Sequence, residues 1–378
     1  MTIKVGALEE GTYFIGNKQT GKYMDLEGAG TADGTPIQQW EFHGQSWSRW
    51  VIKMQRSGAY SIQSAYTGKY IGVENSSTVD GAAIKQYASV DDQPGREWYI
   101  SQTSGGAYRF RPGSSSGMAL AVPASGASTD GTDLVQLAYT NDTNYRDEWV
   151  VERLLPTSGY EVDYSYSLWD EYVSNCCNCY AYAINNQVYP GTNFLWFMQQ
   201  MGEYQGNMYT SFSGENIYNA VVSDYQRYNS IYDQSLVFEP IGRYDVCPAG
   251  TYKVALVISN NDYHWYRQDS DGLWSHKPGI TPVTRLDASN KYIVDPFTAD
   301  WGNYTEFVGY FAVSPWGNMY EISDPIYCYI QGYVVLYDNL MELLDSYYVG
   351  CPIITNTILL SMMCTYYASM EVNSQCTE

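Results

Sequence analysis

The residue types that could do chemistry are concentrated in the second half of the chain. Two of its three histidines, His264 and His276, lie in one short segment, "YHWYRQDSDGLWSHKPG". Upstream, "NCCNCYAYAINN" carries Asn178 and Cys179, and downstream, "KYIVDPF" carries Asp295. A thiol, an imidazole and a carboxylate together predict a nucleophilic site, in which the ring takes the thiol proton and the carboxylate holds the ring in one tautomer.

The position of Cys179 favours a reactive thiol over a structural one. Asn178 has a residue type that caps helices, and the run after it contains Ala181 and Ala183, so a helix is expected to begin here. Backbone amides at a helix start lower the pKa of a thiol and can hold an oxyanion, to which Asn178 would add a donor. The simpler alternative is a buried cysteine that only packs.

We predict no metal site at these cysteines. Three cysteines lie within residues 176–179, but zinc sites need a second pair of ligands at a characteristic spacing. No histidine is near this cluster in the sequence.

Only one of the two histidines is expected to act as the base. Alternation along "YHWYRQ" places His264 on one strand face with Tyr266 and Gln268. His276 is followed by Lys277, whose positive charge opposes formation of an imidazolium ion. His264 is therefore the predicted base, with His276 kept as the alternative.

The elements that would position these groups alternate between strands and helices. An apolar run at 252–259 predicts a strand, and 263–279 predicts two strands joined by the turn "DSDG". Another strand is expected at 291–297. Residues 213–227 predict an amphipathic helix capped by Ser213. The order is a helix-borne thiol, a strand-borne imidazole and a strand-borne carboxylate.

This order resembles that of the papain-like superfamily of cysteine enzymes, including its transglutaminase-type members. In these proteins a cysteine opens the central helix, and a histidine and a polar partner lie on adjacent strands of a sheet. The resemblance covers roughly residues 165 to 315. It implies an α+β papain-like domain, placed at 155–320, with a thiol that cleaves peptide or amide bonds or transfers an acyl group. It also implies that Cys179, His264 and Asp295 form the triad.

The first 154 residues contain three copies of one pattern. Each copy opens with an alternating strand ("GTYFIG", "GAYSIQ", "GAYRFR") and continues with an Asp-Gly turn. A motif then follows ("IQQW", "IKQY", "LVQL"), and a tryptophan closes the copy. The period is about 50 residues, the length of a repeat that needs neighbours to bury its apolar face. Three copies of short strands predict an all-β barrel with a cap. The closing residues are Trp50, Trp98 and Trp149.

This domain resembles the ricin-B-type β-trefoil lectins, whose repeats carry a Gln-x-Trp motif. The motif is intact at Gln38 and Trp40, and the family's sugar-binding aspartate is matched by Asp25. The later copies have Gly72 and Ala121 in that place. The resemblance implies that Asp25 accepts hydrogen bonds from sugar hydroxyls and that Trp40 stacks on the ring. Alternatively, Gln38 and Trp40 only hold the core together.

Length and charge limit the other possibilities. A chain of 378 residues is long enough for two domains, and a composition that is 45% hydrophobic and 16% charged argues against disorder. The net charge of −21 argues against binding to a nucleic-acid backbone, because phosphates would be repelled. Glycans, a basic peptide or protein substrate and calcium are all compatible with it. Residues 321–378 have no motif that we can interpret, and we treat them as an extension of unknown role.

The sequence gives little on location or assembly. The first residues, "MTIKVGALEEGTYF", lack the apolar core of a signal peptide, although the suspected lectin character suggests action outside the cell. No membrane span is expected, because the apolar stretches are interrupted by polar residues. The oligomeric state is not determined.

Two functions from different classes are consistent with these features. The first is a lectin tethered to a thiol hydrolase, an arrangement similar in outline to fungal chimerolectins, in which calcium activates the enzyme. Tethering would raise the local concentration of substrate. The second is a non-catalytic lectin or toxin-like binding protein whose C-terminal domain is a degenerate enzyme fold.

Overall fold

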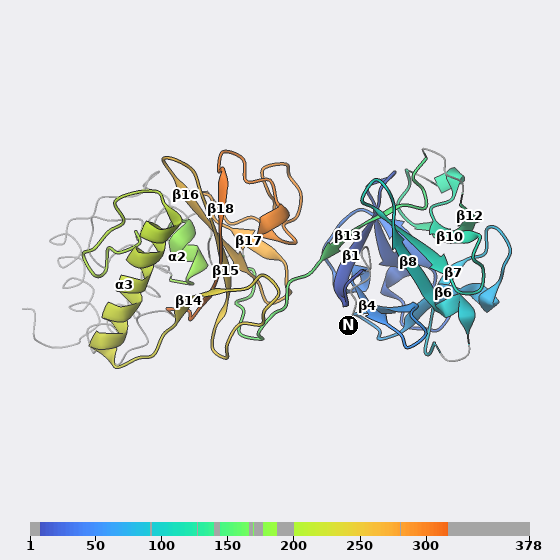
Figure 1. Ribbon diagram of the computed structural model, residues 1–378, viewed down its shortest axis with the longest axis horizontal. Coiled ribbons are helices and arrows are strands. Elements are labelled where there is room, and N and C mark those ends of the chain that lie inside the picture. Colours follow the sequence, from blue (N-terminus) through green and yellow to red (C-terminus); the bar gives the residue numbers. More distant parts are fainter. Residues whose placement is uncertain are drawn as a thin grey trace, which may run out of the picture. The chain divides into compact units, whose positions relative to one another are not determined.

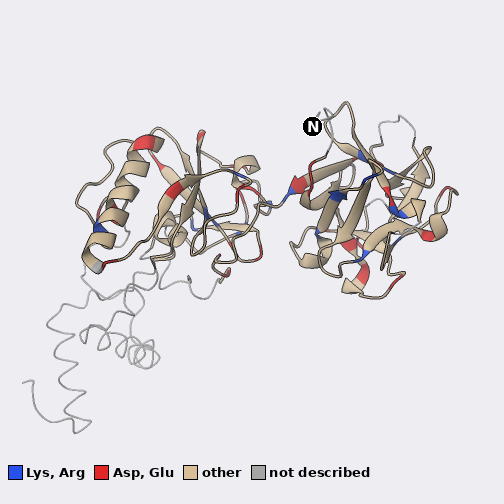
Figure 2. Cartoon of the chain, turned by 60° about the horizontal axis from the view of Figure 1, so that its bottom comes forward, with Lys and Arg blue, Asp and Glu red and all other residues tan. Residues whose placement is uncertain are grey.

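The computed structural model contains an all-β N-terminal domain and a second, mostly β region (Figure 1). Asp and Glu side chains occur in both (Figure 2). The extension at 321–378 and the end of the predicted second domain lie outside the residues that the structure describes. Those residues are 8–90, 93–126, 128–139, 144–165, 169, 177–186, 200–279 and 281–316.

Each of the three sequence repeats contributes four main strands to the N-terminal domain. The first repeat has β1 (Gly11–Asn17), β2 (Tyr23–Leu26), β3 (Ile37–Trp40) and β4 (Trp50–Met54). The second has β5 (Tyr60–Ser64), β6 (Tyr70–Val73), β7 (Ile84–Tyr87) and β8 (Trp98–Gln102). The third has β9 (Tyr108–Pro112), β10 (Met118–Ala121), β12 (Val135–Ala138) and β13 (Trp149–Arg153), with the short β11 (Thr132–Asp133) between them.

Six of these strands close into a ring. Antiparallel pairs join β1 to β4, β4 to β5, β5 to β8, β8 to β9, β9 to β13 and β13 back to β1. Six of the other strands form three hairpins, one from each repeat, and the short β11 pairs with β3. Closure pairs the barrel strands on both sides and so avoids exposed edges. The domain is β-trefoil-like, which confirms the architecture predicted from the repeats.

The closing tryptophans fill the core of the barrel. All three are fully buried at 0% exposure. Each indole Nε1 donates a hydrogen bond to a backbone carbonyl of its own repeat, which satisfies the polar end of a large apolar side chain. These bonds are Trp50 to Met24 at 3.1 Å, Trp98 to Ile71 at 3.1 Å and Trp149 to Leu120 at 3.0 Å.

The glutamine shared by the motifs "IQQW", "IKQY" and "LVQL" links different repeats. In the second repeat, Gln86 donates from Nε2 to the carbonyls of Gly30 and Ala32, both at 2.9 Å, and accepts from Thr67 at 2.8 Å. The equivalent glutamines also donate to backbone carbonyls of another repeat. These bonds are Gln39 to Thr129, and Gln136 to Ser77 and Val79. The repeated residue therefore stabilises the trefoil.

The second region is built on a five-stranded antiparallel sheet. Its strand order is β14 (Phe238–Ile241), β18 (Glu306–Val313), β15 (Tyr252–Ile258), β16 (Tyr263–Gln268) and β17 (Trp274–His276). The α-helices in the described part of this region are α2 (Cys179–Ala183) and α3 (Gly214–Tyr232). Ser213 caps α3 as predicted, with its hydroxyl accepting from the N–H of Asn216 at 3.2 Å. The strands predicted within 252–279 are confirmed.

The segment at 291–297 differs from the predicted strand. In the described part of the chain it makes only isolated bridges, at Tyr292 and Ile293. Asp295 instead caps the 3-10 helix Pro296–Thr298, and its carboxylate accepts from the N–H of Phe297 at 3.0 Å. Proline has no N–H to give to a strand ladder, and its fixed φ suits the first position of a helical turn.

Replacing Gln86 by alanine should destabilise the trefoil by about 2 to 3 kcal/mol, because several buried groups lose their partners together. Chemical denaturation of the full chain, followed by tryptophan fluorescence, measures this change. The matched control is Gln102→Ala, because Gln102 is an exposed residue on β8. Equal stability of the two variants would contradict a role for Gln86 in joining the repeats.

Candidate functional sites

The first repeat brings together the polar residues that the sequence singled out. Asp25 on β2 lies opposite Gln38 on β3, and Tyr23 lies opposite Trp40. Strand alternation therefore places Asp25, Gln38 and Trp40 on one face of this hairpin. Gln38 Nε2 donates to Asp25 Oδ1 at 2.9 Å.

A residue that the sequence analysis missed, His43, completes this cluster. Its Nε2 lies 3.0 Å from Asp25 Oδ2, and its Nδ1 accepts the backbone N–H of Gln45 at 3.1 Å. An N–H can only donate, so in neutral His43 the proton is on Nε2 and points at the carboxylate. The signal that could have revealed it was the third histidine of a histidine-poor chain, three residues after Trp40.

The cluster has a buried polar floor and an open aromatic wall. Asp25 is only 3% exposed, whereas Trp40 is 40% exposed. Among the described residues, Gln38 Oε1 accepts no hydrogen bond, so it is available to a hydroxyl donor. A carboxylate, an amide oxygen and an exposed indole face are the groups with which proteins hold a pyranose.

The second repeat has closed the equivalent space. A Cβ added at Gly72, the position of Asp25, would lie 2.6 Å from Arg96 Cγ and 2.9 Å from the carbonyl oxygen of Gly95. The Arg96 guanidinium lies over the ring of Tyr87, 4.2 Å from its centroid. The side chain of Arg96 therefore occupies both the place of an aspartate and a face of the aromatic ring.

The third repeat has no polar or aromatic side chain at the positions of Asp25, Gln38 and Trp40. Ala121 lies opposite Val135, where the first repeat has Asp25 and Gln38. Leu137 replaces Trp40. Aliphatic side chains offer neither hydrogen bonds nor a π face for a sugar, so the threefold fold presents one complete constellation.

In the second region, α2 begins at the predicted thiol. The side chain of Asn178 accepts the N–H of Ala181 at 2.9 Å, which confirms Asn178 as the helix cap. Its Nδ2 also donates to the hydroxyl of Tyr263 at 3.2 Å. Both ends of the Asn178 amide are thus engaged in holding α2, and its role as an oxyanion donor remains a prediction.

The thiol of Cys179 is neutral at rest. Burial raises its pKa to about 12, although the backbone N–H groups of Trp265, Tyr180 and Cys179 itself lower it. The amides at the helix start therefore act in the expected direction, but desolvation outweighs them. A base would have to remove its proton before this thiol could act as a nucleophile.

Polar side chains fasten α2 to the sheet. The Tyr182 hydroxyl lies 2.6 Å from Ser275 Oγ on β17 and accepts from Arg267 on β16 at 2.8 Å. The Arg267 guanidinium also lies 4.0 Å from the centroid of the Tyr182 ring. The helix that bears the thiol therefore has a fixed position on strands β16 and β17.

Cys179 meets β16 at the residue next to His264. The ring of Trp265 faces α2 and lies 5.9 Å from the ring of Tyr180, so His264 points to the opposite face of the strand. β17 pairs with β16 only along Tyr266 to Gln268. β17 does not extend as far as Trp265. The backbone N–H of Trp265 is therefore not used by β17, and it donates to the thiol of Cys179. The pairing of the Cys179 thiol with the His264 imidazole stays a prediction.

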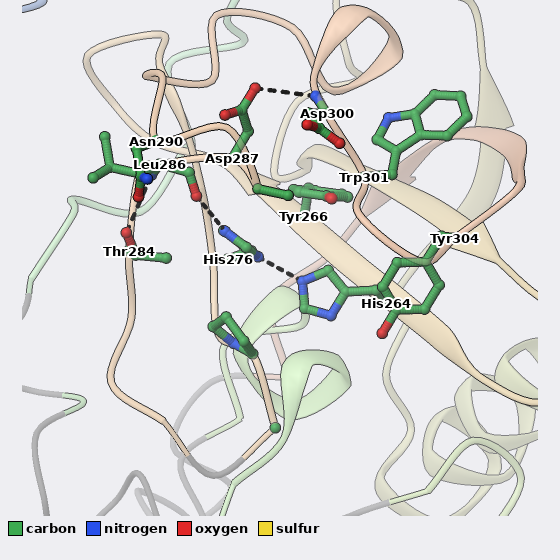
Figure 3. Close-up of a pocket in the computed structure, with 13 residues that line it drawn as sticks. His264, Tyr266, His276, Thr284, Leu286, Asp287, Asn290, Asp300, Trp301 and Tyr304 are labelled. Carbon is green, nitrogen blue, oxygen red and sulfur yellow. Dashed lines mark hydrogen bonds between the residues drawn. The ribbon is translucent and has the colours of Figure 1, made fainter.

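His264 and His276 form a hydrogen-bonded pair (Figure 3). His264 Nε2 lies 2.6 Å from His276 Nδ1, and His276 Nε2 lies 2.9 Å from the carbonyl oxygen of Leu286. From the sequence, only one of the two histidines was expected to act as the base, whereas in the structure they are hydrogen-bonded to each other.

The carbonyl of Leu286 determines where the protons lie. Burial lowers the pKa of both imidazoles, and the neighbouring His276 lowers that of His264 further, so both rings are neutral. A carbonyl only accepts, so His276 carries its proton on Nε2 and accepts at Nδ1. His264 must then donate from Nε2, which leaves its Nδ1 unprotonated and able to take a proton.

Asp295, the predicted orienting carboxylate, is engaged elsewhere. Its Oδ2 accepts from Arg243 Nε at 2.6 Å and Nη2 at 2.5 Å, and its Oδ1 accepts from Phe297 and from the hydroxyl of Tyr310. Neither imidazole is among its hydrogen-bond partners in the described residues. The place expected for Asp295 beside His264 is taken by His276.

A pocket of about 420 Å³ lies at the histidine pair. Its floor includes both imidazoles, and Asp287, Asp300 and Trp301 line it on the other side (Figure 3). Cys179 does not line it.

Among the described residues, no group of three or more His, Cys, Asp or Glu side chains is arranged to hold a metal ion. Likewise, no helix in that part of the chain has the length and apolar character needed to cross a membrane.

Comparison with known proteins identifies the N-terminal region. The model of the ricin-type β-trefoil lectin domain-like family matches residues 4–40 and 45–137. Insoluble matrix shell protein 1 of Ruditapes philippinarum is 37% identical over 140 residues, which is 36% of this chain and 80% of that protein.

Solved structures are also similar to part of this chain. A designed threefold-symmetric protein, ThreeFoil, is 30% identical, with 38% of this chain and 99% of that one covered and a TM-score of 0.35. The ricin B-like lectin of Macrolepiota procera, solved with lactose, is 22% identical, with 39% and 99% covered and a TM-score of 0.33.

Substituting Gly72 by alanine should destabilise the chain by about 1 to 3 kcal/mol, because the new methyl group overpacks against Arg96 and the Gly95 carbonyl. Gly117→Ala is the matched control, since a Cβ there meets nothing within 4 Å. Thermal unfolding of both variants checks this. If Gly72→Ala leaves the unfolding temperature unchanged, the second repeat still has room for a ligand.

Proposed function

Through its N-terminal region the chain belongs to the ricin-type β-trefoil lectin domain-like family, and we infer that it binds carbohydrate at one site in its first repeat. The observation that carries this inference is the hydrogen-bonded set of Asp25, Gln38 and His43 beside the exposed ring of Trp40. The two later repeats keep the fold and lack this set.

The geometry supports different roles for the residues of this site. Gln38 and His43 each donate to a different oxygen of Asp25, so the carboxylate is held in one orientation. Each oxygen retains a lone pair for a sugar hydroxyl. Trp40 supplies the apolar surface for the face of the ring. A single site of this kind gives no avidity from the trefoil itself, so binding is that of one sugar.

Asp25→Asn and Trp40→Ala should each weaken binding at least about tenfold, equivalent to about 1.4 kcal/mol, because one removes the charged acceptor and the other the stacking surface. A glycan array finds the ligand, and calorimetry with the best sugar measures the change. Tyr87→Ala, at the equivalent position of the closed second repeat, should leave affinity unchanged. Retained affinity in Asp25→Asn would remove the first repeat as the site.

A second function is favoured by a separate observation: the second region holds a buried histidine pair and, at the start of α2, a buried thiol. We propose that the second region is a papain-like thiol hydrolase acting on peptide or amide bonds, with Cys179 as nucleophile and His264 as base. His276 then takes the orienting role in place of Asp295. The trefoil would hold this enzyme close to glycan-bearing substrates.

The proposed reaction follows the proton positions in the pair. The Cys179 proton passes to His264 Nδ1 as Sγ forms a bond to the substrate carbonyl carbon. That proton then passes to the amine nitrogen as the C–N bond breaks. Water, deprotonated at the same Nδ1, cleaves the thioester and restores the thiol. An amine in place of water would give acyl transfer.

Labelling by iodoacetamide tests the pairing of Cys179 with His264. In the wild type, the rate at Cys179 should be nearly constant at neutral pH and fall only below the lowered pKa of His264, where Nδ1 becomes protonated. In His264→Gln the rate at neutral pH should drop by about 100-fold and rise with pH towards the thiol's own raised pKa.

Cys247 is the internal control, because it is also buried, with a pKa raised to about 11 by burial. Its labelling should not respond to His264→Gln. If Cys179 and Cys247 label alike in both proteins, the second region is a binding domain without a reactive thiol, and the chain is a lectin alone.

A further inference from the structure

The pocket at the histidine pair has an acidic rim that backbone amides hold in place. Asp287 accepts the N–H groups of Ser289 and Lys291, both at 2.9 Å, and that of Asp300 at 3.0 Å. Asp300 accepts the N–H of Gly302 at 2.9 Å. A hydrogen bond from Ser289 lowers the pKa of Asp300, so this exposed carboxylate is ionised at neutral pH. The rim is therefore negative before any ligand arrives.

Aromatic rings form one wall of the same pocket (Figure 3). Tyr304 stacks on His264 with 5.5 Å between ring centroids, and its hydroxyl donates to Asp262 at 3.0 Å. Trp301 donates from Nε1 to the carbonyl of Pro296 at 2.5 Å. Both rings are thus fixed, and their faces attract cations.

The floor adds no positive charge that would oppose a cation. Both imidazoles are neutral, and His264, only 4% exposed, has an Nδ1 that accepts no hydrogen bond in the described part of the chain. Two lysines are near. Lys277 is buried and donates to the carbonyl of Gly279 at 2.6 Å. The charge of Lys291 helps to lower the pKa of Asp300 and offsets part of the rim's charge.

From these features we propose that the pocket binds a protonated amine or guanidinium group of the substrate. The proposal rests on the proposed thiol hydrolase for its catalytic meaning, and it gives that enzyme a basic substrate. A volume of about 420 Å³ is in the range of small-molecule sites and accommodates a lysine or arginine side chain. The net charge of −21 favours the approach of such a substrate.

The test uses cadaverine as a probe of the pocket and 1-pentanol as its uncharged counterpart. The protein is the full chain carrying Cys179→Ser, so that no reaction interferes. Calorimetry gives the affinity, and ¹⁵N-labelled histidine spectra locate the probe, since the chain has only three histidines. We expect cadaverine to bind, to shift the His264 and His276 signals and to leave His43 unchanged. Pentanol should bind at least about fivefold more weakly.

Asp300→Asn removes the charge and keeps an oxygen for the N–H of Gly302, so the rim loop should survive. This substitution should lower the affinity for cadaverine at least about fivefold and leave the affinity for pentanol unchanged. Glu239→Gln, at an exposed carboxylate on β14, is the matched control and should change neither. Equal binding of the two probes, shifts confined to His43, or full affinity in Asp300→Asn would overturn the proposal.

The test of amine binding can fail or succeed independently of the test of the proposed hydrolase. Cadaverine binding in the Cys179→Ser chain does not depend on a reactive thiol, whereas iodoacetamide labelling does not depend on the pocket. Amine binding without fast labelling would leave a cation pocket on a non-catalytic domain. Fast labelling without amine binding would keep the enzyme and remove its preference for basic substrates.

Discussion

The hydrogen bond from His276 to the carbonyl of Leu286 fixes the proton positions of two buried imidazoles in the second region. A carbonyl cannot donate, so this one contact of 2.9 Å fixes the proton of His276 on Nε2. Through the 2.6 Å contact between the rings it also fixes the proton of His264. Two buried neutral imidazoles in series then leave a single basic atom, Nδ1 of His264. A carboxylate hydrogen-bonded to His276 would bring a negative charge into this buried place. The carbonyl of Leu286 fixes the same tautomer of His276 without a charge.

In the trefoil, the residues that build the fold occur in all three repeats, whereas the polar cluster of the first repeat does not. Closing tryptophans and bridging glutamines occur in all three repeats, because each repeat must bury its face on the others. Asp25, Gln38 and Trp40 are not needed for that purpose, and the later repeats have replaced them. In the second repeat Arg96 fills the vacated space, which restores packing and excludes a ligand.

Much of the framework was predictable from the residues. The repeats predicted the trefoil, and apolar runs predicted β15, β16 and α3, because these signals are local and periodic. Asn178 was recognisable as a helix cap by its type and place. The segment around Asp295 was misjudged as a strand, because Pro296 and the capping carboxylate act on a single turn that an apolar run conceals.

The sequence alone determined the repeat, its degenerate copies, the helix that begins at Cys179 and the acidic balance of the chain. All of these follow from composition and from spacing along the backbone. Only the tertiary structure decided that His43 joins Asp25, that His276 rather than Asp295 contacts His264, and that Arg96 closes the second repeat. Those pairings join residues of separate elements, and no local pattern encodes which side chains meet once the strands are paired and the loops are packed.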